Sequence, residues 1–375
     1  MQTMSIASAP RGARSVAAVL PSNRIFYLDS LRVVLTILVI AHHVGQAYGP
    51  TGGYWPVQES ARAAILGPFF TVNRSFFMSL FFMISGYFMI GAYQRNGFGA
   101  FIRGRLVRLG VPVLAFAALM LPARIFLFHD HITRWDDWFN AAHLWYLEHV
   151  LLFSVVYALW RKLRGAAPEL SKRPAPRLPI ILAALLLVAV VCGVVRIWFP
   201  IDRWVNLGGF FRAAFSDVPR DLAFFIFGAM AFRRGWFESF STRKGLGWLA
   251  AGVAAAIAMY AWRLIPHPGL QLSERGFAVA HLLWEEVVAF GMCIGLLVAF
   301  RQVANAQGPF GKLLAANQYS AYFWHPTLIV GIQMVFVALP LGPFVKFVAV
   351  TALGVPVVFA WSWLLRKVPA VRAVL

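Results

Sequence analysis

The stretch DSLRVVLTILVIAHH, residues 29–43, decides how the rest of the chain is interpreted. Arg32 opens an apolar run, and the histidine pair His42 and His43 lies inside it. The run from residue 31 to about residue 48 is long enough to cross a bilayer as a helix. Because a helix turns by about 100° per residue, Arg32 and His43 differ by about 20° in facing and lie roughly 16 Å apart along the axis. Ionisable groups at membrane depth are costly, so this stripe is the first candidate for a functional site.

The composition indicates a membrane protein. Of 375 residues, 60% are hydrophobic and only 13% are charged, which is too little polar surface for a soluble protein of this length. The formal net charge of +20 is spread in short clusters between apolar runs, which disfavours nucleic-acid binding and favours a topological role. Cys192 and Cys293 both lie within apolar runs, so neither a disulfide framework nor a metal site is expected.

The apolar segments predict an all-α, polytopic integral membrane protein of about ten transmembrane helices. We expect residues 1–24 to be a disordered cytoplasmic tail and residues 25–375 to form a single transmembrane domain. The predicted segments are 31–49, 74–93, 107–128, 143–160, 178–198, 220–232, 246–263, 277–300, 319–338 and 344–365. Connections after the even-numbered segments are rich in Arg and Lys, and connections after the odd-numbered segments hold most of the loop acids. This alternation fits the positive-inside rule with both chain ends in the cytoplasm.

His43 is the leading candidate for catalysis. A neutral imidazole in a water-accessible cavity can take a proton from a hydroxyl group. The alternative is a core histidine that bonds to a neighbouring helix. Arg32 on the same stripe, and Asp29 one turn before it, favour the functional role. Arg32 alone is ambiguous, because arginines at the cytoplasmic end of a helix are common topological anchors.

A cluster of three arginines, Arg103, Arg105 and Arg108, precedes or enters the third predicted segment. Arg105 and Arg108 are three residues apart, so they are neighbours on a helix face. Two guanidinium groups at a cytoplasmic mouth suit a phosphate-bearing ligand. Positive-inside anchoring explains the same positions equally well.

Polar residues in the second and fourth segments have both structural and functional interpretations. Ser85 precedes Gly86, and close helix packing is the favoured role of this pair. His143, Trp145 and Tyr146 are compatible with an interfacial belt. In the same segment, Glu148 lies about a turn deeper and needs a partner.

Two further groups lie in the last third of the chain. His325 sits beside the kinking residue Pro326 within a span. Glu285 and Glu286 are two acids inside the eighth segment, and they cannot both face lipid. A structural charge pair with Arg32, Arg74 or another buried base is favoured over a functional role.

Together these residues resemble the membrane acyltransferase family 3, which includes bacterial O-acetyltransferases and glucan succinyltransferases. The spacing of Arg32 and His43, separated by ten residues, is similar to the first-helix signature of that family and selects His43 over His42. The other stretches that carry the resemblance are SGY at 85–87, RLVRL at 105–109, HLWYL at 143–147 and YFWHP at 322–326. Val33 departs from the glycine that many members have at this position, which leaves the subgroup open.

The resemblance implies an O-acyltransferase of the bacterial inner membrane. Acyl-coenzyme A would be the cytoplasmic donor, without a permanently bound cofactor, and its phosphates would be met by Arg105 and Arg108, with Arg103 beside them. His43 would act as general base on an acceptor hydroxyl or as a transient acyl carrier, assisted by Arg32 and Asp29. The acceptor would be a saccharide or a glycosylated molecule. The residues expected to line the substrate cavity are Ser85, His143, Trp145, Tyr146, Glu148 and His325.

Many members of this family carry a fused extracytoplasmic hydrolase-like domain, which is not evident in this sequence. Where such an activity is needed, a separate periplasmic partner protein would supply it. No nucleic-acid partner and no metal ion are expected.

A secondary transporter is the alternative function, because it would also place Arg, His and Glu near the membrane midplane. A transporter predicts an internal repeat, and the two halves of the chain show no convincing similarity. A catalytically inactive scaffold is a third hypothesis, which the intact Arg32, His43, Arg105 and Arg108 disfavour. The sequence leaves open the acyl group, the acceptor, the choice between base and carrier for His43, and the oligomeric state.

Overall fold

The computed structural model describes residues 25–50, 55–126, 141–165, 170–208, 211–266 and 273–375. Helices make up nearly all of this structure, which confirms the predicted all-α membrane class. The long helices are α1 Phe26–Gly45, α2 Leu66–Arg105, α3 Val111–Phe126, α4 Trp145–Arg164, α5 Leu178–Arg196, α6 Val218–Arg234, α8 Thr242–Leu264, α9 Glu274–Val303, α10 Pro309–Val337 and α11 Pro343–Leu365. The predicted tail, residues 1–24, lies outside the described residues.

Short elements connect the long helices. A π-helical turn, η2 Leu106–Gly110, joins α2 to α3, and a 3₁₀ turn, η4 Ala142–Leu144, leads into α4. A hairpin of β1 Trp204–Leu207 and β2 Phe211–Ala214, paired antiparallel, precedes α6. The remaining short helices are α7 Trp236–Ser239 and α12 Pro369–Val374.

Each of the ten predicted segments coincides with one of the long helices, but the number of membrane spans is not confirmed. Within the described residues, eight helical stretches are long and apolar enough to cross a membrane. One of these is the continuous stretch Leu66–Met120, which contains the second predicted segment and residues 107–120 of the third. The sixth predicted segment corresponds to α6, which has only 17 residues. The ten-span count and the side on which the termini lie therefore stay predictions.

A bend at Gly97 explains how α2 can be so long. Its 40 residues would extend about 60 Å as a straight helix, which is about twice the thickness of the hydrocarbon core. Gly97 has a φ of 68°, a left-handed conformation that glycine adopts without the usual steric cost. The helix therefore changes direction there, and the part after Gly97 leads to η2 and α3.

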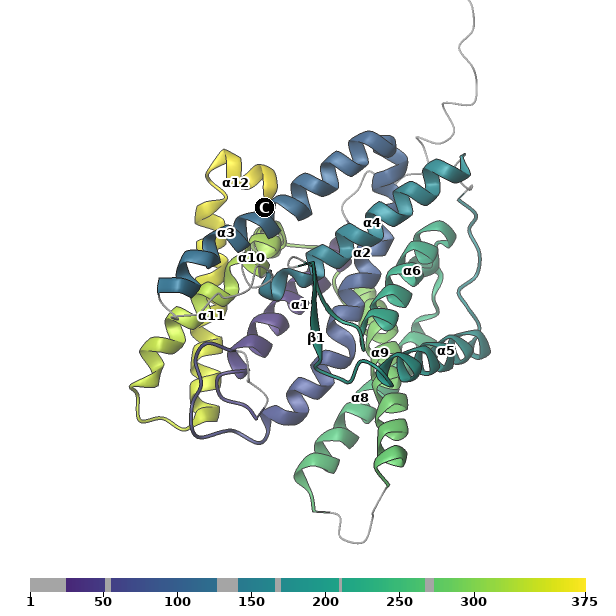
Figure 1. The fold of residues 1–375 in the computed structure, drawn as a ribbon. Coiled ribbons are helices and arrows are strands. Elements are labelled where there is room, and N and C mark those ends of the chain that lie inside the picture. Colours follow the sequence, from purple (N-terminus) through teal and green to yellow (C-terminus); the bar gives the residue numbers. More distant parts are fainter. Residues whose placement is uncertain (1–24, 51–54, 127–140, 166–169, 209–210, 267–272) are drawn as a thin grey trace, which may run out of the picture.

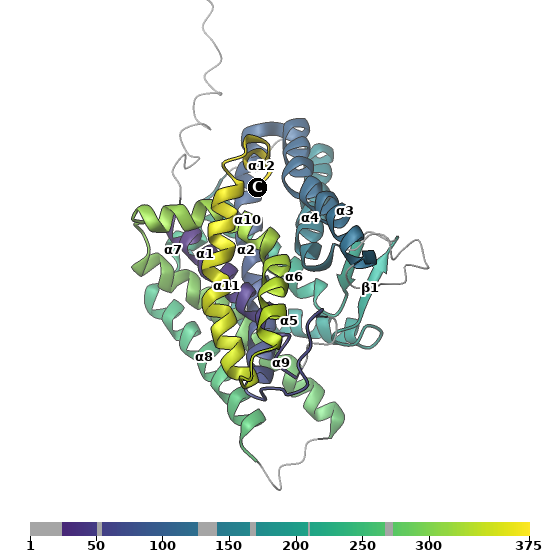
Figure 2. The same ribbon diagram turned by 90° about the vertical axis from the view of Figure 1, so that its left-hand side faces the viewer.

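Two helix pairs flank the centre of the molecule. α10 packs along α11 and also against α1, whereas α8 packs along α9. α1 and α2 lie between these pairs (Figure 1). In the turned view of Figure 2, α10 and α11 are nearest to the viewer. α2 also packs closely along α6. The two backbones approach so closely at Gly86 and Gly228 that a side chain at either position would collide with the opposing backbone. These contacts position the polar side chains of α1, α2, α6, α9 and α10 in the interior.

The predicted topology assigns a side to each end of the bundle. α12 lies at the same end as the junction between α2 and α3 (Figure 1). We call this the cytoplasmic end, following the basic connections, and we call the opposite end, where α8 ends and α9 begins, the outer end.

Candidate active site

Three histidines from distant parts of the chain meet in the interior. His43 comes from α1, His143 from η4 and His325 from α10. The ring centroid of His325 lies 4.9 Å from that of His43 and 4.8 Å from that of His143. Nδ1 of His43 lies 3.3 Å from Nε2 of His325. His143 and His325 are buried, whereas His43 is partly exposed.

The nitrogens of the histidine cluster are turned mainly towards carbonyl oxygens. Nδ1 of His43 lies 2.9 Å from the carbonyl oxygen of Val39. Nε2 of His143 and Nδ1 of His325 lie 3.0 Å and 2.7 Å from the carbonyl oxygen of Tyr322. In the part of the chain that the structure describes, no group of three His, Cys, Asp or Glu side chains is arranged to hold a metal ion. The contacts of the three imidazoles with the carbonyl oxygens are hydrogen bonds.

A polar cavity of about 190 Å³ lies beside His43. It is also lined by His42, His143, Trp145 and Tyr322, and by charged side chains that the sequence did not connect with His43. These charged residues are Arg74, Asp202, Asp217, Arg220 and Asp221. We call this space the His43 cavity.

A larger cavity of about 740 Å³ adjoins the His43 cavity. The two share His42, Gln46, Arg74 and Asp202 among their lining residues. The large cavity extends between α5 and α9 towards the outer end, where it is also lined by Arg263 in the last turn of α8. The His43 cavity thus lies next to this larger space on the outer side of the molecule, which we call the outer cavity.

Ion pairs hold the charged residues of these cavities together. Arg74 bonds to Asp202 at 2.7 Å and to Asp217 at 3.0 Å. Arg196 lies 3.4 Å from Asp217 and 2.6 Å from Glu285. Buried charges need such partners, because the attraction between them must offset their desolvation.

The same ion-pair network includes the two acids of α9. Arg220, which is almost fully buried, lies 3.1 Å from Asp217, 3.7 Å from Glu285 and 3.6 Å from Glu286. The structure thus pairs Glu285 and Glu286 with other buried bases, Arg196 and Arg220, and not with Arg32 or Arg74, the two bases named from the sequence. The network therefore joins α2, α5, α6 and α9 around the cavities.

Asp217, directly before α6, is the hub of the network. Burial by itself raises the pKa of this carboxyl group, but Arg74, Arg220 and Arg196 together lower its pKa to about 2. The carboxylate therefore stays ionised at neutral pH and holds three guanidinium groups in place.

A third, smaller cavity of about 30 Å³ lies on the cytoplasmic side of Tyr322. It is lined by Arg32, Phe81, Tyr146, Tyr319 and Tyr322, among others, and we call it the Arg32 cavity. The hydroxyl groups of Ser85 and Tyr146 are hydrogen-bonded at 2.6 Å.

The arginine cluster lies near the Arg32 cavity. The hydroxyl group of Tyr319, which lines this cavity, donates to the carbonyl oxygen of Arg108. The guanidinium group of Arg105 stacks 5.0 Å from the ring of Phe101. Arg103 is exposed. The predicted role of Arg103, Arg105 and Arg108 in holding the donor stays a prediction.

Some predicted site residues line none of the three polar cavities, including Asp29, Ser85, Glu148 and His325. Asp29 is in the first turn of α1, about 21 Å from His43 along the helix axis, and it lines none of the three cavities. Glu148 is buried and accepts a hydrogen bond of 3.0 Å from the backbone N–H of Arg212. This hydrogen bond anchors the β-hairpin to α4 and provides the partner that the buried carboxyl group of Glu148 needs.

Two residues near His43, Trp55 and Gln333, were not predicted from the sequence as site residues. The ring of Trp55 lies 5.4 Å from that of His43, and its Nε1–H donates to Oε1 of Gln333 at 2.6 Å. Nε2 of Gln333 donates to the carbonyl oxygen of Val44 at 3.0 Å. The only sequence signal was that Gln333 is an isolated amide in the apolar ninth segment. No spacing rule links it to Trp55, which lies 278 positions away in the sequence.

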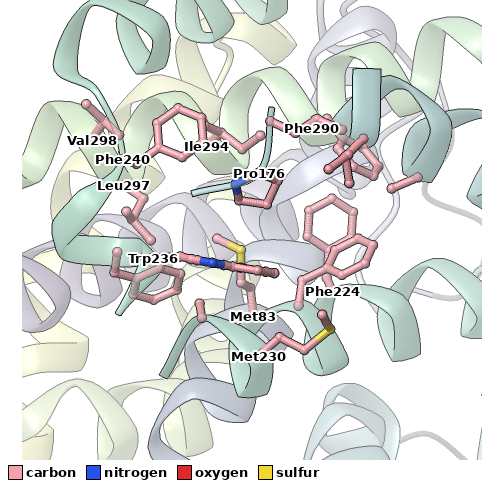
Figure 3. Close-up of a pocket in the computed structure, with 16 residues that line it drawn as sticks. Met83, Pro176, Phe224, Met230, Trp236, Phe240, Phe290, Ile294, Leu297 and Val298 are labelled. Atoms are coloured by element: carbon pink, nitrogen blue, oxygen red, sulfur yellow. The ribbon is translucent and has the colours of Figure 1, made fainter. Parts of the chain in front are cut away.

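A separate apolar pocket of about 170 Å³ lies among α2, α5, α6, α7 and α9. Met83, Phe224, Met230 and Trp236 point into it (Figure 3). None of the predicted site residues lines this pocket. The side chains that line it include no titratable group.

A bundle of membrane-length helices that encloses a histidine cluster and a buried charge network defines a multi-pass membrane protein with an internal polar site. The family comparison is specific about its activity: the chain belongs to the acyltransferase domain family, whose model matches residues 25–367. The description of this family, acyltransferase domain, supports an enzyme that transfers acyl groups. This result favours the enzyme over the transporter.

Curated relatives agree with the family assignment. Glucans biosynthesis protein C of Salmonella typhimurium is 29% identical over 232 residues, which cover 56% of this chain and 59% of that protein. Glucans biosynthesis protein C of Escherichia coli is 27% identical over 263 residues, which cover 65% of this chain and 66% of that protein. The matches thus span between 59% and 66% of the length of these relatives. No solved protein structure matches the chain significantly.

Proposed function

We propose that the protein transfers an acyl group from cytoplasmic acyl-coenzyme A to a saccharide hydroxyl at the outer side of the bacterial inner membrane. The observation that carries this proposal is the position of His43. It borders a polar cavity that adjoins the outer cavity, while its ring is held by hydrogen bonds from the protein side. A proton acceptor placed in this way is suited to activate an alcohol that enters from outside.

The donor would approach from the cytoplasmic end. The Arg32 cavity lies on that side of Tyr322, and the arginine cluster is adjacent to it through the contact between Tyr319 and Arg108. Guanidinium groups bind phosphates with well-defined geometry, so Arg105 and Arg108 suit the phosphates of the coenzyme. The thioester would then reach past Tyr322 to His43.

The acceptor would occupy the outer cavity. Its volume of about 740 Å³ lies in the range of small-molecule sites. Arg74, Arg263 and Asp202 present charged donors and acceptors there, and Phe277 adds an aromatic face. This mixture suits a polyhydroxylated molecule, and the printed name of the relatives, glucans biosynthesis protein C, favours a glucan.

The proposed reaction needs one base. His43 takes the proton of the acceptor hydroxyl while the oxygen attacks the thioester carbonyl carbon. A C–O bond forms, the C–S bond breaks, and the proton passes from the imidazolium to the leaving thiolate. A two-step route, in which His43 carries the acyl group transiently, would use the same nitrogen.

Transfer of radiolabel tests this proposal. Membranes containing the protein would be incubated with radiolabelled acetyl-CoA or succinyl-CoA and with glucan from a bacterial cell envelope. We expect covalent label on the glucan, and a loss of at least about a hundredfold in His43→Ala, since a general base contributes that much or more. His42→Ala is the matched control, and we expect it to retain transfer at a reduced rate because it removes a cavity side chain but not the base.

The same membranes distinguish the proposed enzyme from the alternative, a secondary transporter. Movement of unmodified glucan across vesicles, without covalent label from either acyl-CoA, would contradict the proposed reaction. Full transfer by His43→Ala would contradict the assignment of the base.

A further inference from the structure

Pro326 creates an unusual acceptor inside α10. In a regular helix the backbone N–H of residue 326 would donate to the carbonyl oxygen of Tyr322, but proline has no N–H. The free carbonyl oxygen accepts instead from Nδ1 of His325 at 2.7 Å and from Nε2 of His143 at 3.0 Å. The kinking proline thus fixes the orientation of both imidazoles.

These contacts determine which nitrogen of His325 carries the proton. A carbonyl oxygen only accepts, so Nδ1 of His325 must be the N–H group. In a neutral imidazole the other nitrogen then has a free electron pair. Nε2 of His325 therefore offers an acceptor to Nδ1 of His43, 3.3 Å away.

The same logic applies to His43. Both neighbours of its Nδ1, the carbonyl oxygen of Val39 and Nε2 of His325, are acceptors. The proton of neutral His43 must therefore lie on Nδ1, which leaves the electron pair on Nε2. Among the described residues, Nε2 of His43 has no hydrogen-bond partner, and the side chain borders the His43 cavity.

We propose that His325 is a positioning residue that fixes the tautomer and ring orientation of His43, so that Nε2 is the reactive nitrogen. The inference rests on the proposed function only in taking His43 as the base. During the reaction the hydroxyl proton of the acceptor moves to Nε2, and the proton on Nδ1 stays in place. The bond from Nδ1–H to His325 then becomes charge-assisted and stronger, so His325 stabilises the imidazolium without touching the substrate.

Two substitutions of His325 separate this role from simple packing. His325→Leu removes the acceptor for His43, and we expect kcat to fall about 10- to 100-fold, as for other residues that orient a reactive group. KM for the acyl-CoA should stay the same, because His325 lines none of the described cavities. His325→Gln keeps an oxygen acceptor at similar reach, and we expect it to restore most of kcat.

Pro326→Ala is a milder test that leaves the histidines intact. The new N–H would compete with His325 for the carbonyl oxygen of Tyr322. We expect a partial loss of kcat, with KM unchanged. This variant keeps the proposal testable if His325→Leu does not fold, and wild-type kcat in Pro326→Ala together with low kcat in His325→Gln would then overturn it.

Solid-state ¹⁵N NMR gives a direct readout. In protein labelled with ¹⁵N-histidine, the signals that disappear in His43→Asn belong to His43. We expect a protonated Nδ1 and an unprotonated Nε2 in the wild type, and a mixture of both tautomers in His325→Leu. An unchanged tautomer with wild-type kcat in His325→Leu would overturn the inference.

The two proposals fail in different ways. Full activity of His43→Ala would remove the base itself. Loss of activity in His43→Ala together with full activity in His325→Leu would leave the proposed function intact and refute only the role of His325.

Discussion

Arg32 and His43 lie on the same helix but line two different cavities, and the side chain of Tyr322 borders both. Arg32 faces the Arg32 cavity, and His43 faces the His43 cavity, which adjoins the outer cavity. The two residues should therefore affect different substrates. This separation leads to the first two predictions.

Arg32→Ala should weaken donor binding more than it slows the chemistry. Loss of a charge-assisted contact costs about 1.5–3 kcal/mol, so we expect KM for acyl-CoA to rise about 10- to 100-fold. Arg32→Lys should keep part of the affinity, because the charge remains but the guanidinium fork is lost. Initial rates over a series of acyl-CoA concentrations measure this. An unchanged KM with a lower kcat in Arg32→Ala would place Arg32 in the chemical step instead.

Tyr322→Ala should open a passage between the Arg32 cavity and the His43 cavity. Water could then reach the thioester, so we expect acyl-CoA hydrolysis in the absence of acceptor to rise several-fold above the wild type. Release of free coenzyme A thiol measures this. Tyr322→Phe is the matched control, because it keeps the ring between the cavities and removes only the hydroxyl group that donates to the carbonyl oxygen of His143. Equal hydrolysis by both variants would contradict the separating role of the ring.

Arg263→Ala should weaken acceptor binding without affecting stability. Arg263 lines the outer cavity, is exposed, and has no ion pair among the residues with described positions. We expect KM for the glucan to rise about 3- to 10-fold, which corresponds to one hydrogen bond, while the midpoint of thermal unfolding stays the same. Arg275→Ala removes an exposed arginine at the same end that lines none of the described cavities, and it should change neither value. Similar effects of both substitutions would point to general electrostatics.

Asp217→Asn should destabilise the fold. The substitution leaves Arg74, Arg196 and Arg220 without their shared carboxylate, and breaking a buried ion pair costs about 3–5 kcal/mol. Thermal unfolding in detergent measures the loss. Asp202→Asn is the control, because the side chain of Asp202 is 78% exposed, and an exposed ion pair contributes at most about 1 kcal/mol.

The destabilisation by Asp217→Asn should depend on pH. The pKa of Asp217 is lowered from its ordinary value of 3.8 to about 2 in the folded protein. A lowered pKa stabilises the fold at pH values above the ordinary pKa, and this contribution is lost as the pH falls towards 2. The difference between the wild type and the variant should therefore be constant near neutral pH and shrink below about pH 4. A difference that grows on acidification would contradict this account of the network.

The sequence by itself determined the class of protein, the positions of the helices and the family. Long apolar segments must form helices in a bilayer, because each backbone polar group needs a partner within its own segment. This rule is local, so it located α1, α4, α5 and α11 from composition alone. The motifs around Arg32, His43, Arg105 and Arg108 then indicated the acyltransferase family, which the match to residues 25–367 confirmed.

Only the tertiary structure decided which polar side chains meet. It brought His325 and His143 to His43, gave Glu285 and Glu286 to Arg196 and Arg220, and divided the stripe of α1 between two cavities. The rotation of each helix about its axis, and its neighbours, are set by packing between helices, including the close approach at Gly86 and Gly228. Such contacts join residues hundreds of positions apart, and no pattern within a single segment contains them.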